Sequence, residues 1–416
     1  MGVLSPTQAY RTDMEGLRAI SVLFVVLYHA VPDTFSGGFI GVDSFFVISG
    51  FLITTILLRN KTFSIVDFYC RRIRRIFPAL IMLILFCAVF GGFVLLPNEY
   101  RLLGKHMVAA AFFVSNMAFL NEAGYFNSAA EVRPLLHLWS LGLEEQFYLL
   151  WPLVVYALRR QRRVLLGGSL VLAAISFALN VYKIGSDTVF AFYLPPTRFW
   201  ELLAGCVIAQ VYFFQPEKRR HRHWDHGLAV IGLGLLVFGF FHITNLIPCL
   251  GFWMTIPVLG SACIIMSGPD AWVNRAILSN PMAVWFGRIS YPLYLWHWPL
   301  LAFSRAMDLD GTAHAGSLAL SVVLAWLTYR YLEQPVRQGW GGRRTAWLLG
   351  VSLLGMGAVG GLFYTTDGLP SRFDVLAPEN KAKLIKLGPV DKGDSQTHRD
   401  VIQHWSLRRP VACVAI

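Results

Sequence analysis

Apolar segments long enough to cross a lipid bilayer recur along most of this sequence of 416 residues. A helix needs about 20 apolar residues to span the hydrocarbon core, and a helix satisfies its own backbone hydrogen bonds there. The composition agrees, because 56% of the residues are hydrophobic and only 14% are charged. Such a small share of charged residues is too low for the surface of a soluble protein. The sequence therefore predicts an all-α fold: a polytopic helical bundle of about ten core spans, one extra C-terminal span and one re-entrant or interfacial segment.

The direction of the predicted bundle follows from the positive charges in its short loops. Residues 59–75, RNKTFSIVDFYCRRIRR, carry six Lys and Arg, and the positive-inside rule places them in the cytoplasm. The N-terminus is then cytoplasmic and the C-terminal tail periplasmic. The predicted crossings are residues 17–31, 39–58, 76–96, a helix beginning near 143, 164–181, 197–214, 228–243, 250–266, 283–303, 318–332 and 346–364.

Residues 105–120 do not fit this alternation as a simple crossing. The helix that begins near residue 143 ends in four cations and so travels inward, which requires either residues 105–120 or the stretch just before that helix to be re-entrant or interfacial. We divide the chain into a membrane domain at 11–337, the extra span at 338–364 and a polar periplasmic tail at 365–416. No internal repeat is visible, which weakens the case for an inverted-repeat transporter.

The formal net charge is +12, which in a soluble protein would suggest a nucleic-acid partner. Here the cations lie beside spans, so we predict membrane lipids as partners and no nucleic acid. The six cysteines show no metal-type spacing and lie mostly in or beside apolar segments, so we predict neither a metal site nor a disulfide framework. The first apolar run lacks a cleavage site and is interpreted as an uncleaved span. The sequence does not indicate the oligomeric state.

Two ionisable residues belong to the first apolar segment. Arg18 and His29 are eleven residues apart, which on one helix is about three turns, or roughly 16 Å, along a shared face. Taken singly, Arg18 fits a snorkelling anchor and His29 fits an interfacial imidazole. Taken together, two costly groups at membrane depth indicate a functional site that uses both sides of the bilayer. His29 is able to take a proton from a hydroxyl at neutral pH.

The second apolar segment opens with GGFIGVDSFFVISGFLI at residues 37–53. Its glycines permit close backbone approach, and Ser49 is small enough for a helix contact. Asp43 has three interpretations that remain open at this point: a helix N-cap, a group that orients His29, or the partner of an arginine.

Two charged stretches follow. The first holds four arginines: Arg71, Arg72, Arg74 and Arg75. Topology alone accounts for them, although arginine forks beside a helix start also suit phosphate oxygens. The second, WSLGLEEQFYLLWP, holds Glu144 and Glu145, which point about 100° apart on a helix. They are interpreted either as an interfacial pair in an aromatic belt or, as we favour, as carboxylates of which one faces a polar cavity.

Supporting candidates lie further along the chain. Arg198 and Glu201 are three residues apart on one helix, and an intramembrane salt bridge explains them at least as well as catalysis does. The stretch SYPLYLWHWPL contributes Ser290, Tyr291 and His297. An aromatic-belt histidine is the alternative for His297. The tripeptide at residues 393–395, Gly-Asp-Ser, matches the short motif of some nucleophilic serines, lacks a partner Asp-x-x-His and is treated as chance.

Together these motifs resemble the acyltransferase-3 family of integral membrane acyltransferases, in the group that O-acetylates bacterial surface polysaccharides. The matches follow the family's order from about residue 11 to 337: Arg18…His29, GFIGVDSFFVISGFLI, RRIRRIFPAL, WSLGLEEQFYLLWPL, RFWELLAG, ISYPLYLWHWPL and YLEQPVR. Some members continue after an extra span into a periplasmic SGNH hydrolase-like domain. This sequence has that span and a similar linker, DGLPSRF, and then ends at residue 416, which leaves open a short form or a truncated SGNH-type domain.

The resemblance implies transfer of an acyl group, usually acetyl from cytoplasmic acetyl-CoA, to a hydroxyl of an extracytoplasmic glycan. The acceptor would be O-antigen of lipopolysaccharide, capsule or exopolysaccharide, and the enzyme would lie in the bacterial inner membrane. Residues matched to the family's site are Arg18 and His29 as its essential pair, Arg71, Arg72, Arg74 and Arg75 on the CoA side, and Glu144 and Glu145 in its third motif. We expect no permanently bound cofactor, and acetyl-CoA or another acyl-CoA as the donor substrate.

We further expect Asp43 or the Glu144–Glu145 pair to tune His29 near the outer face. Two other functions remain open. The first is that the chain is a transporter of a small anion or lipid-linked sugar. The second is that it is an acyl-export subunit that serves a separate transferase.

Overall fold

The fold is helical throughout the part of the chain that the structure describes. The computed structural model describes residues 11–59, 64–122, 131–214, 222–243, 251–309, 311–338 and 342–372, and within these ranges it contains no strand. The α-helices are α1 (Thr12–Ala30), α2 (Gly41–Arg59), α3 (Ile65–Val94), α4 (Pro97–Ala111), α5 (Ser115–Leu120), α6 (Leu138–Leu158), α7 (Arg162–Ile184), α8 (Thr188–Tyr193), α9 (Pro195–Phe214), α10 (Arg222–His242), α11 (Thr255–Ser267), α12 (Pro281–Arg288), α13 (Ser290–Ala306), α14 (Gly311–Leu327), α15 (Gln334–Gln338) and α16 (Arg343–Thr365). Short 3-10 or π segments cover Gly38–Ile40, Gly251–Met254, Asn274–Leu278 and Thr328–Glu333. The predicted all-α class is confirmed.

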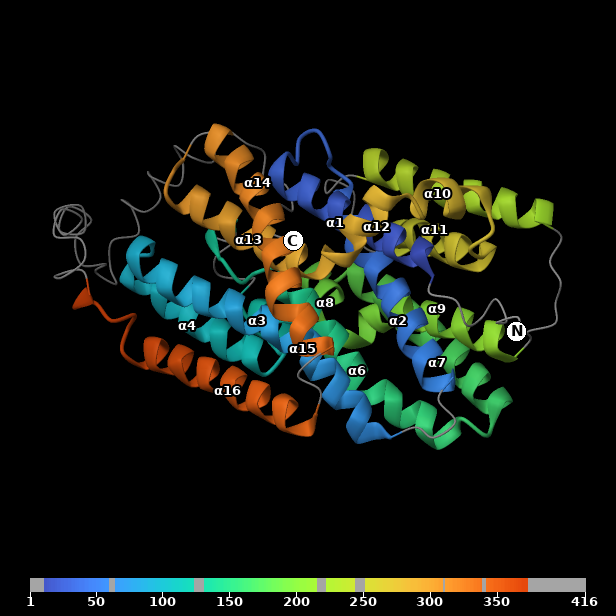
Figure 1. Ribbon diagram of the computed structural model, residues 1–416, viewed down its shortest axis with the longest axis horizontal. Helices are drawn as coiled ribbons and strands as arrows, with labels where there is room; N and C mark the ends of the chain where they lie inside the picture. The colour runs from blue at the N-terminus through green and yellow to red at the C-terminus, as the bar shows by residue number, and fades with distance from the viewer. Residues whose placement is uncertain are drawn as a thin grey trace.

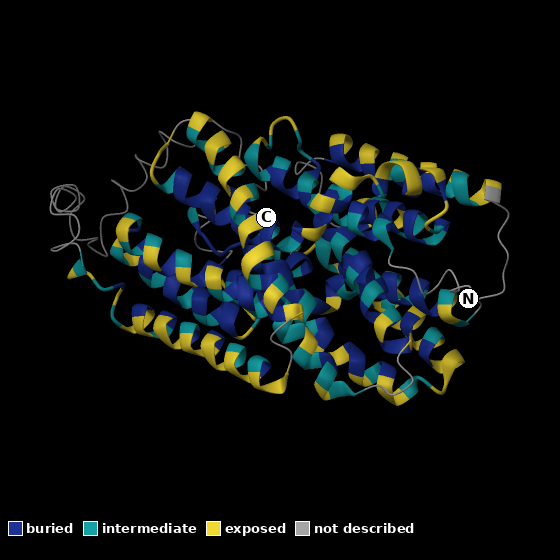
Figure 2. Cartoon of the chain, in the orientation of Figure 1, coloured by how far each residue is buried: buried dark blue, intermediate teal, exposed yellow. Residues whose placement is uncertain are grey.

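Six of the described helical stretches are long and apolar enough to cross a membrane. They are Gly38–Arg59, Ile65–Val94, Arg162–Ile184, His223–His242, Gly311–Gln338 and Arg343–Thr365. The peripheral helices α7, α10, α14 and α16 expose large apolar side chains, and Figure 2 shows exposed residues along their outer faces, as expected of helices that face lipid. The chain is a multi-pass membrane protein, and the total of about eleven spans stays a prediction.

Helix α3 is longer than the span predicted at residues 76–96. Its 30 residues correspond to about 45 Å, against about 30 Å for the hydrocarbon core. The four arginines of RRIRR therefore lie on the first turns of a continuous helix rather than in a loop. Arginine is a good helix former, and its long stem lets the charged group reach the headgroup level while the helix continues.

Two short helices replace a simple crossing at residues 105–120. Helix α4 has 15 residues and α5 has six, so α4 is about 22 Å long and shorter than the hydrocarbon core. Phe113, between them, has a φ angle of 55°, a left-handed conformation that breaks the helix. The interfacial or re-entrant placement of this region stays a prediction.

Helices α2 and α9 pack with their backbones in close approach near the centre of the bundle (Figure 1). A Cβ atom on Gly50 would lie 1.9 Å from the carbonyl oxygen of Leu202, and one on Gly205 would lie 2.0 Å from that of Val47. The missing side chains let the two helices meet, as small residues do between membrane helices. This contact brings the start of α2 beside the start of α9.

Helix α16 packs against α4 and α3 at the edge of the bundle, as Figure 1 shows. Gly104 and Gly360 face each other across α4 and α16, where an added Cβ would lie 2.5 or 2.6 Å from the opposing carbonyl oxygen. Beyond α16, Arg372 donates to the carbonyl oxygen of Leu95, and its guanidinium lies 3.9 Å from the ring centroid of Tyr100. The extra helix is thus packed onto the others. Most of the predicted tail, including residues 393–395, lies outside the described residues.

Candidate active site

Two cavities lie inside the bundle and share part of their lining. The histidine cavity is lined by residues that include Tyr28, His29, Asp43, His137, Arg198, Trp298 and Arg305. The arginine cavity is lined by residues that include Arg18, Ser49, Arg72, Arg75, Glu144, Glu145, Ser290 and Tyr291. Their volumes are about 790 and 870 Å³, counting space open to the outside. Val42 and Tyr294 line both cavities, so the cavities adjoin at these two side chains.

A chain of hydrogen bonds fixes the tautomer of His29 in the histidine cavity. Nδ1 of His297 lies 3.2 Å from the carbonyl oxygen of Leu293, and because a carbonyl oxygen only accepts, Nδ1 carries the proton. In the neutral ring Nε2 is then an acceptor. It lies 3.0 Å from Nδ1 of His29, which must therefore donate. The neutral ring of His29 is left with its lone pair on Nε2, the form that a general base needs.

The backbone and ring of His29 are also held in place. Nη2 of Arg305 donates to the carbonyl oxygen of His29 at 2.6 Å, near the C-terminal end of α1, where a cation is favourable. The ring of Trp298 meets the ring of His29 edge to face, with centroids 4.6 Å apart. The Trp298 indole in turn donates to the carbonyl oxygen of Arg133 at 2.8 Å. These contacts position the imidazole at the wall of the cavity.

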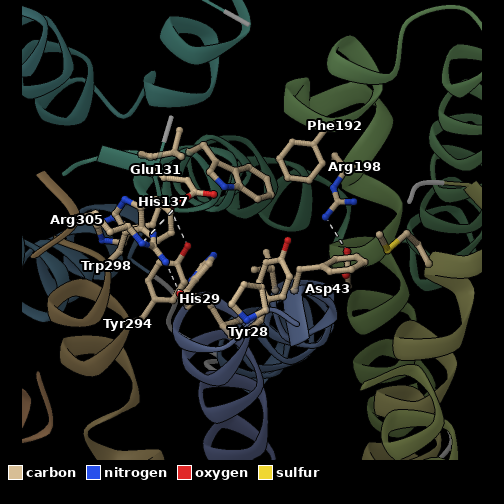
Figure 3. Close-up of a pocket in the computed structure, with 17 residues that line it drawn as sticks. Tyr28, His29, Asp43, Glu131, His137, Phe192, Arg198, Tyr294, Trp298 and Arg305 are labelled. Carbon is tan, nitrogen blue, oxygen red and sulfur yellow. Dashed lines mark hydrogen bonds and ion pairs between the residues drawn. The ribbon is translucent and has the colours of Figure 1, made fainter. Parts of the chain in front are cut away.

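The opposite end of the histidine cavity holds a buried ion pair. Figure 3 shows His29, Trp298 and Arg305 at one end and the Asp43–Arg198 pair at the other. Nη2 of Arg198 donates to Oδ1 of Asp43 at 2.7 Å, and both side chains are about 1% exposed. Glu201, one turn along α9, lies 3.3 Å from Nη1 of Arg198. Of the three interpretations of Asp43, the structure shows the pairing with an arginine. The guanidinium of Arg198 neutralises the Asp43 carboxylate, whose charge would be costly at this depth if it were unpaired.

A third histidine, His137, completes the wall beside His297. The two rings meet at about a right angle, with centroids 5.8 Å apart. His137 is 3% exposed, and neither ring nitrogen makes a hydrogen bond of normal geometry to another described residue. Among the described residues, no three His, Cys, Asp or Glu side chains are placed to hold one metal ion. A buried imidazole with open hydrogen-bonding capacity suits a polar ligand group in the cavity.

The arginine cavity combines three guanidinium groups with two carboxylates. Its members are Arg18, Arg72 and Arg75, and Glu144 and Glu145. The Arg72 guanidinium lies 3.9 Å from the ring centroid of Tyr148, a cation–π contact. The hydroxyls of Tyr148 and Ser49 both donate to Oε1 of Glu144. Nη1 of Arg18 pairs with Glu15 at 3.2 Å. The lining thus offers the guanidinium groups of Arg72 and Arg75 to a ligand, while Arg18 is already paired with Glu15 and Glu144 is engaged by two hydroxyls.

Arg71 and Arg74 do not line this cavity. Arg71 is exposed, and Nε of Arg74 donates to the carbonyl oxygen of Cys70, one turn earlier in α3, at 3.3 Å. On a helix, positions 72 and 75 share one face and 71 and 74 share another. Two of the four arginines thus face the interior.

The structure divides the predicted site residues between the two cavities. Arg18, Ser49, the two glutamates, Ser290 and Tyr291 line the arginine cavity; His29, Asp43 and Arg198 line the histidine cavity, with His297 behind His29. The ring partner of His29 is His297, whereas Asp43 contacts Arg198 and the glutamates lie in the other cavity. This arrangement differs from the expectation that Asp43 or the glutamates tune His29 directly.

Wall residues that are absent from the predicted set include His137, Tyr294, Trp298 and Arg305. A sequence signal exists for two of them. Tyr291, Tyr294 and His297 recur at a spacing of three, which places them on successive turns of one helix face. His137 lies two residues before the stretch WSLGLEEQFYLLWP that contains Glu144 and Glu145. Arg305 and Trp298 carry no such signal, because an arginine and a tryptophan near a helix end are also what a membrane interface favours.

Comparison with known proteins identifies the matched region. The family model for the acyltransferase domain of the acyltransferase-3 family matches residues 11–330, which contain every residue that lines the two cavities. A Staphylococcus aureus protein of strain MSSA476, named as a candidate O-acetyltransferase, is 32% identical over 355 residues, covering 79% of this chain and 58% of the relative. The O-acetyltransferase OatA of strain NCTC 8325 is 31% identical over 350 residues, covering 79% and 57%. The match thus covers a little over half the length of these relatives. No solved structure matches.

By its family match and its relatives, the chain belongs to the acyltransferase-3 family.

Proposed function

We propose that this protein transfers an acyl group, typically acetyl, from cytoplasmic acyl-CoA to a hydroxyl of an extracytoplasmic polysaccharide such as O-antigen, capsule or exopolysaccharide. The observation that carries the proposal is the junction of two unlike cavities at Val42 and Tyr294. One cavity is rich in guanidinium groups and the other presents an imidazole lone pair. A donor that bears phosphates and an acceptor that bears hydroxyls fit these two chemistries.

The donor belongs in the arginine cavity. Arg18, Arg72 and Arg75 offer planar forks that suit the phosphates of CoA, and Arg71 and Arg74 add positive charge on another face of the same part of α3. Acetyl-CoA or another acyl-CoA acts as a substrate, and no resident cofactor is needed. The six cations of residues 59–75, which run from the end of α2 into α3, support a cytoplasmic position for this cavity by the positive-inside rule. The histidine cavity then opens toward the periplasmic side of the inner membrane.

The acceptor belongs in the histidine cavity. Nε2 of His29 takes the proton of the acceptor hydroxyl while the hydroxyl oxygen forms a bond to the acyl carbon. The bond from the acyl carbon to sulfur breaks, and the thiolate leaves with its electron pair and takes up one proton. The products are an acyl ester and the free thiol of CoA. The hydrogen bond from Nδ1 of His29 to His297 keeps the basic nitrogen toward the acceptor throughout.

Two other functions make different predictions. A transporter of a small anion or lipid-linked sugar would also place charges inside a bundle, but it forms no ester. An acyl-export subunit would form ester only in the presence of a second protein. The paired histidines favour chemistry within this chain, because transport of an anion needs no imidazole with a fixed tautomer.

The test uses membranes from cells that make the protein, incubated with radiolabelled acetyl-CoA. We expect label in alkali-labile esters of the extracytoplasmic glycan. We also expect His29→Ala to lower the incorporation by about 100-fold or more, the usual contribution of a general base. His242→Ala is the matched control, because His242 is exposed on α10, and it should leave incorporation unchanged. Incorporation at the wild-type level by His29→Ala, at equal protein abundance, would overturn the proposal. A requirement for a second gene product would instead favour acyl export.

A further inference from the structure

Tyr294 occupies the junction between the two cavities. It lies in the second turn of α13 and lines both the histidine cavity and the arginine cavity, as does Val42 of α2. The turn before it on α13 places Tyr291 in the arginine cavity, and the turn after it places His297 against His29. Tyr294 thus stands between the donor side and the base along one helix face.

The position of the Tyr294 side chain is fixed by hydrogen bonds at its far end. Its hydroxyl lies 2.6 Å from Oγ of Ser140 and donates to the carbonyl oxygen of His137 at 2.7 Å. Both partners belong to the start of α6 or the turn before it, so the ring bridges α13 and α6. A ring held at both ends keeps one rotamer and cannot swing aside at low cost.

The junction is apolar apart from that hydroxyl. Val42 is buried, and the ring of Phe45 meets the ring of Tyr294 edge to face with centroids 6.5 Å apart. Such a lining offers nothing to a phosphate or a sugar, but it accommodates the methyl end of an acyl group. An acyl group that leaves a donor in the arginine cavity and meets a hydroxyl beside His29 has to pass or reach these side chains.

We propose that Tyr294 and Val42 form a size filter that admits a short acyl group to the histidine cavity and rejects longer ones. The inference rests on the proposed function and adds to it the chain length of the acyl donor. The fixed Tyr294 ring and the Val42 side chain, which both line the two cavities, together set the width. Tyr294 is a specificity-determining residue here, while the proton transfer belongs to His29.

The test is a competition between acetyl-CoA and butanoyl-CoA at equal concentration, in membranes that contain the protein. The acyl esters on the glycan are released with mild alkali and their ratio is measured by mass spectrometry. We expect the wild-type protein to transfer acetyl almost alone. We expect Tyr294→Ala to raise the butanoyl-to-acetyl ratio about tenfold or more, since each extra methylene in a closely fitting site changes selectivity by roughly that factor. Val42→Ala should raise the ratio less, and Val42→Phe should lower it.

The control is Tyr331→Ala, because Tyr331 is 68% exposed and lines neither cavity. The butanoyl-to-acetyl ratio of this variant should match that of the wild type. If Tyr294→Ala does not accumulate in the membrane, Val42→Ala and Val42→Phe decide the question. Unchanged ratios in the variants that still transfer acetyl would overturn the filter and leave the proposed function intact. Absence of any acyl transfer by the wild-type protein would overturn the proposed function itself.

Discussion

Nδ1 of His29 on α1 lies 3.0 Å from Nε2 of His297 on α13, and the planes of the two rings differ by only 16°, with ring centroids 5.2 Å apart. The carbonyl oxygen of Leu293 accepts from the other side of His297. The proton positions along this chain are therefore determined by a backbone group that cannot titrate. His297 thus fixes the tautomer of His29, a role that a carboxylate plays beside many catalytic histidines.

The first prediction concerns His297 as a positioning residue. His297→Leu removes the acceptor for Nδ1 of His29, so the ring loses its preference for the tautomer with a basic Nε2. We expect kcat to fall about tenfold or more, the worth of one hydrogen bond at a buried site, and the pH profile of kcat to change. His297→Gln restores an acceptor oxygen and should recover part of the loss. Equal kcat values and equal pH profiles for the wild type and both variants would show that His297 is a packing residue.

The second prediction concerns the arginine cavity. Arg72→Ala removes a guanidinium that lines the cavity beside Tyr148. We expect KM for acetyl-CoA to rise about tenfold or more, since hydrogen bonds to charged groups contribute about 1.5–3 kcal/mol, while kcat changes little. Arg59→Ala is the matched control, because Arg59 is an exposed cation at the end of α2. A KM that rises equally in both variants would mean that general surface charge, and not the cavity, attracts the donor.

The third prediction concerns the contact between α2 and α9. Gly50→Ala places a methyl group 1.9 Å from the carbonyl oxygen of Leu202, which forces the helices apart. We expect a loss of about 1–3 kcal/mol in stability, the usual cost of overpacking, seen as a lower thermal midpoint in detergent. Gly168→Ala is the control, because nothing lies within 4 Å of its added Cβ. Equal midpoints for the two variants would contradict the close approach.

The fourth prediction concerns Glu122, which follows α5 outside the spanning helices. It accepts from Lys105, His106 and Arg133 at 2.7, 3.1 and 2.8 Å. Burial favours a raised pKa for Glu122, but hydrogen bonds from His106 and Lys105 and the nearby charges outweigh it and lower the pKa to about 2. Since the pKa is lowered on folding, the stabilisation is complete above the usual value of 4.5 and is lost as the pH falls toward 2.

Glu122→Gln leaves Lys105 and Arg133 without their carboxylate, and we expect a loss of about 3 kcal/mol at pH 7, as for a broken buried ion pair. Asp67→Asn is the control. Asp67 pairs with Arg343 at 3.3 Å, and the two side chains are 49% and 71% exposed, so the loss should stay below about 1 kcal/mol. Thermal midpoints measured at pH 7 and pH 4 compare the two variants with the wild type. A Glu122→Gln midpoint equal to that of the wild type would exclude a stabilising cluster.

The sequence was sufficient to predict the helical membrane class, because hydropathy and loop charge are local properties. It was less able to predict helix ends. The arginines at 71–75 were expected before a span, yet α3 runs through them, since arginine does not break a helix and nothing in RRIRR marks a start.

The sequence did not predict which site residues contact one another, because these contacts depend on packing between segments that are distant in the chain. His29 and His297 are 268 residues apart, and either one alone fits an interfacial imidazole. Asp43 and Arg198 are 155 residues apart, and their pairing follows from the glycine contact between α2 and α9. The spacing of Arg18 and His29 on one helix was visible, because both lie on the same face of α1.

The most direct test of the transfer path separates donor and acceptor by a membrane. Purified protein is reconstituted into vesicles that enclose surface polysaccharide from cells lacking this protein, and labelled acetyl-CoA is added outside. We predict labelled ester on the enclosed glycan with the wild-type protein, and about 100-fold less with His29→Ala. Equal labelling by the two proteins, or labelling that requires acetyl-CoA and glycan in the same compartment, would contradict a path that leads from the arginine cavity to His29.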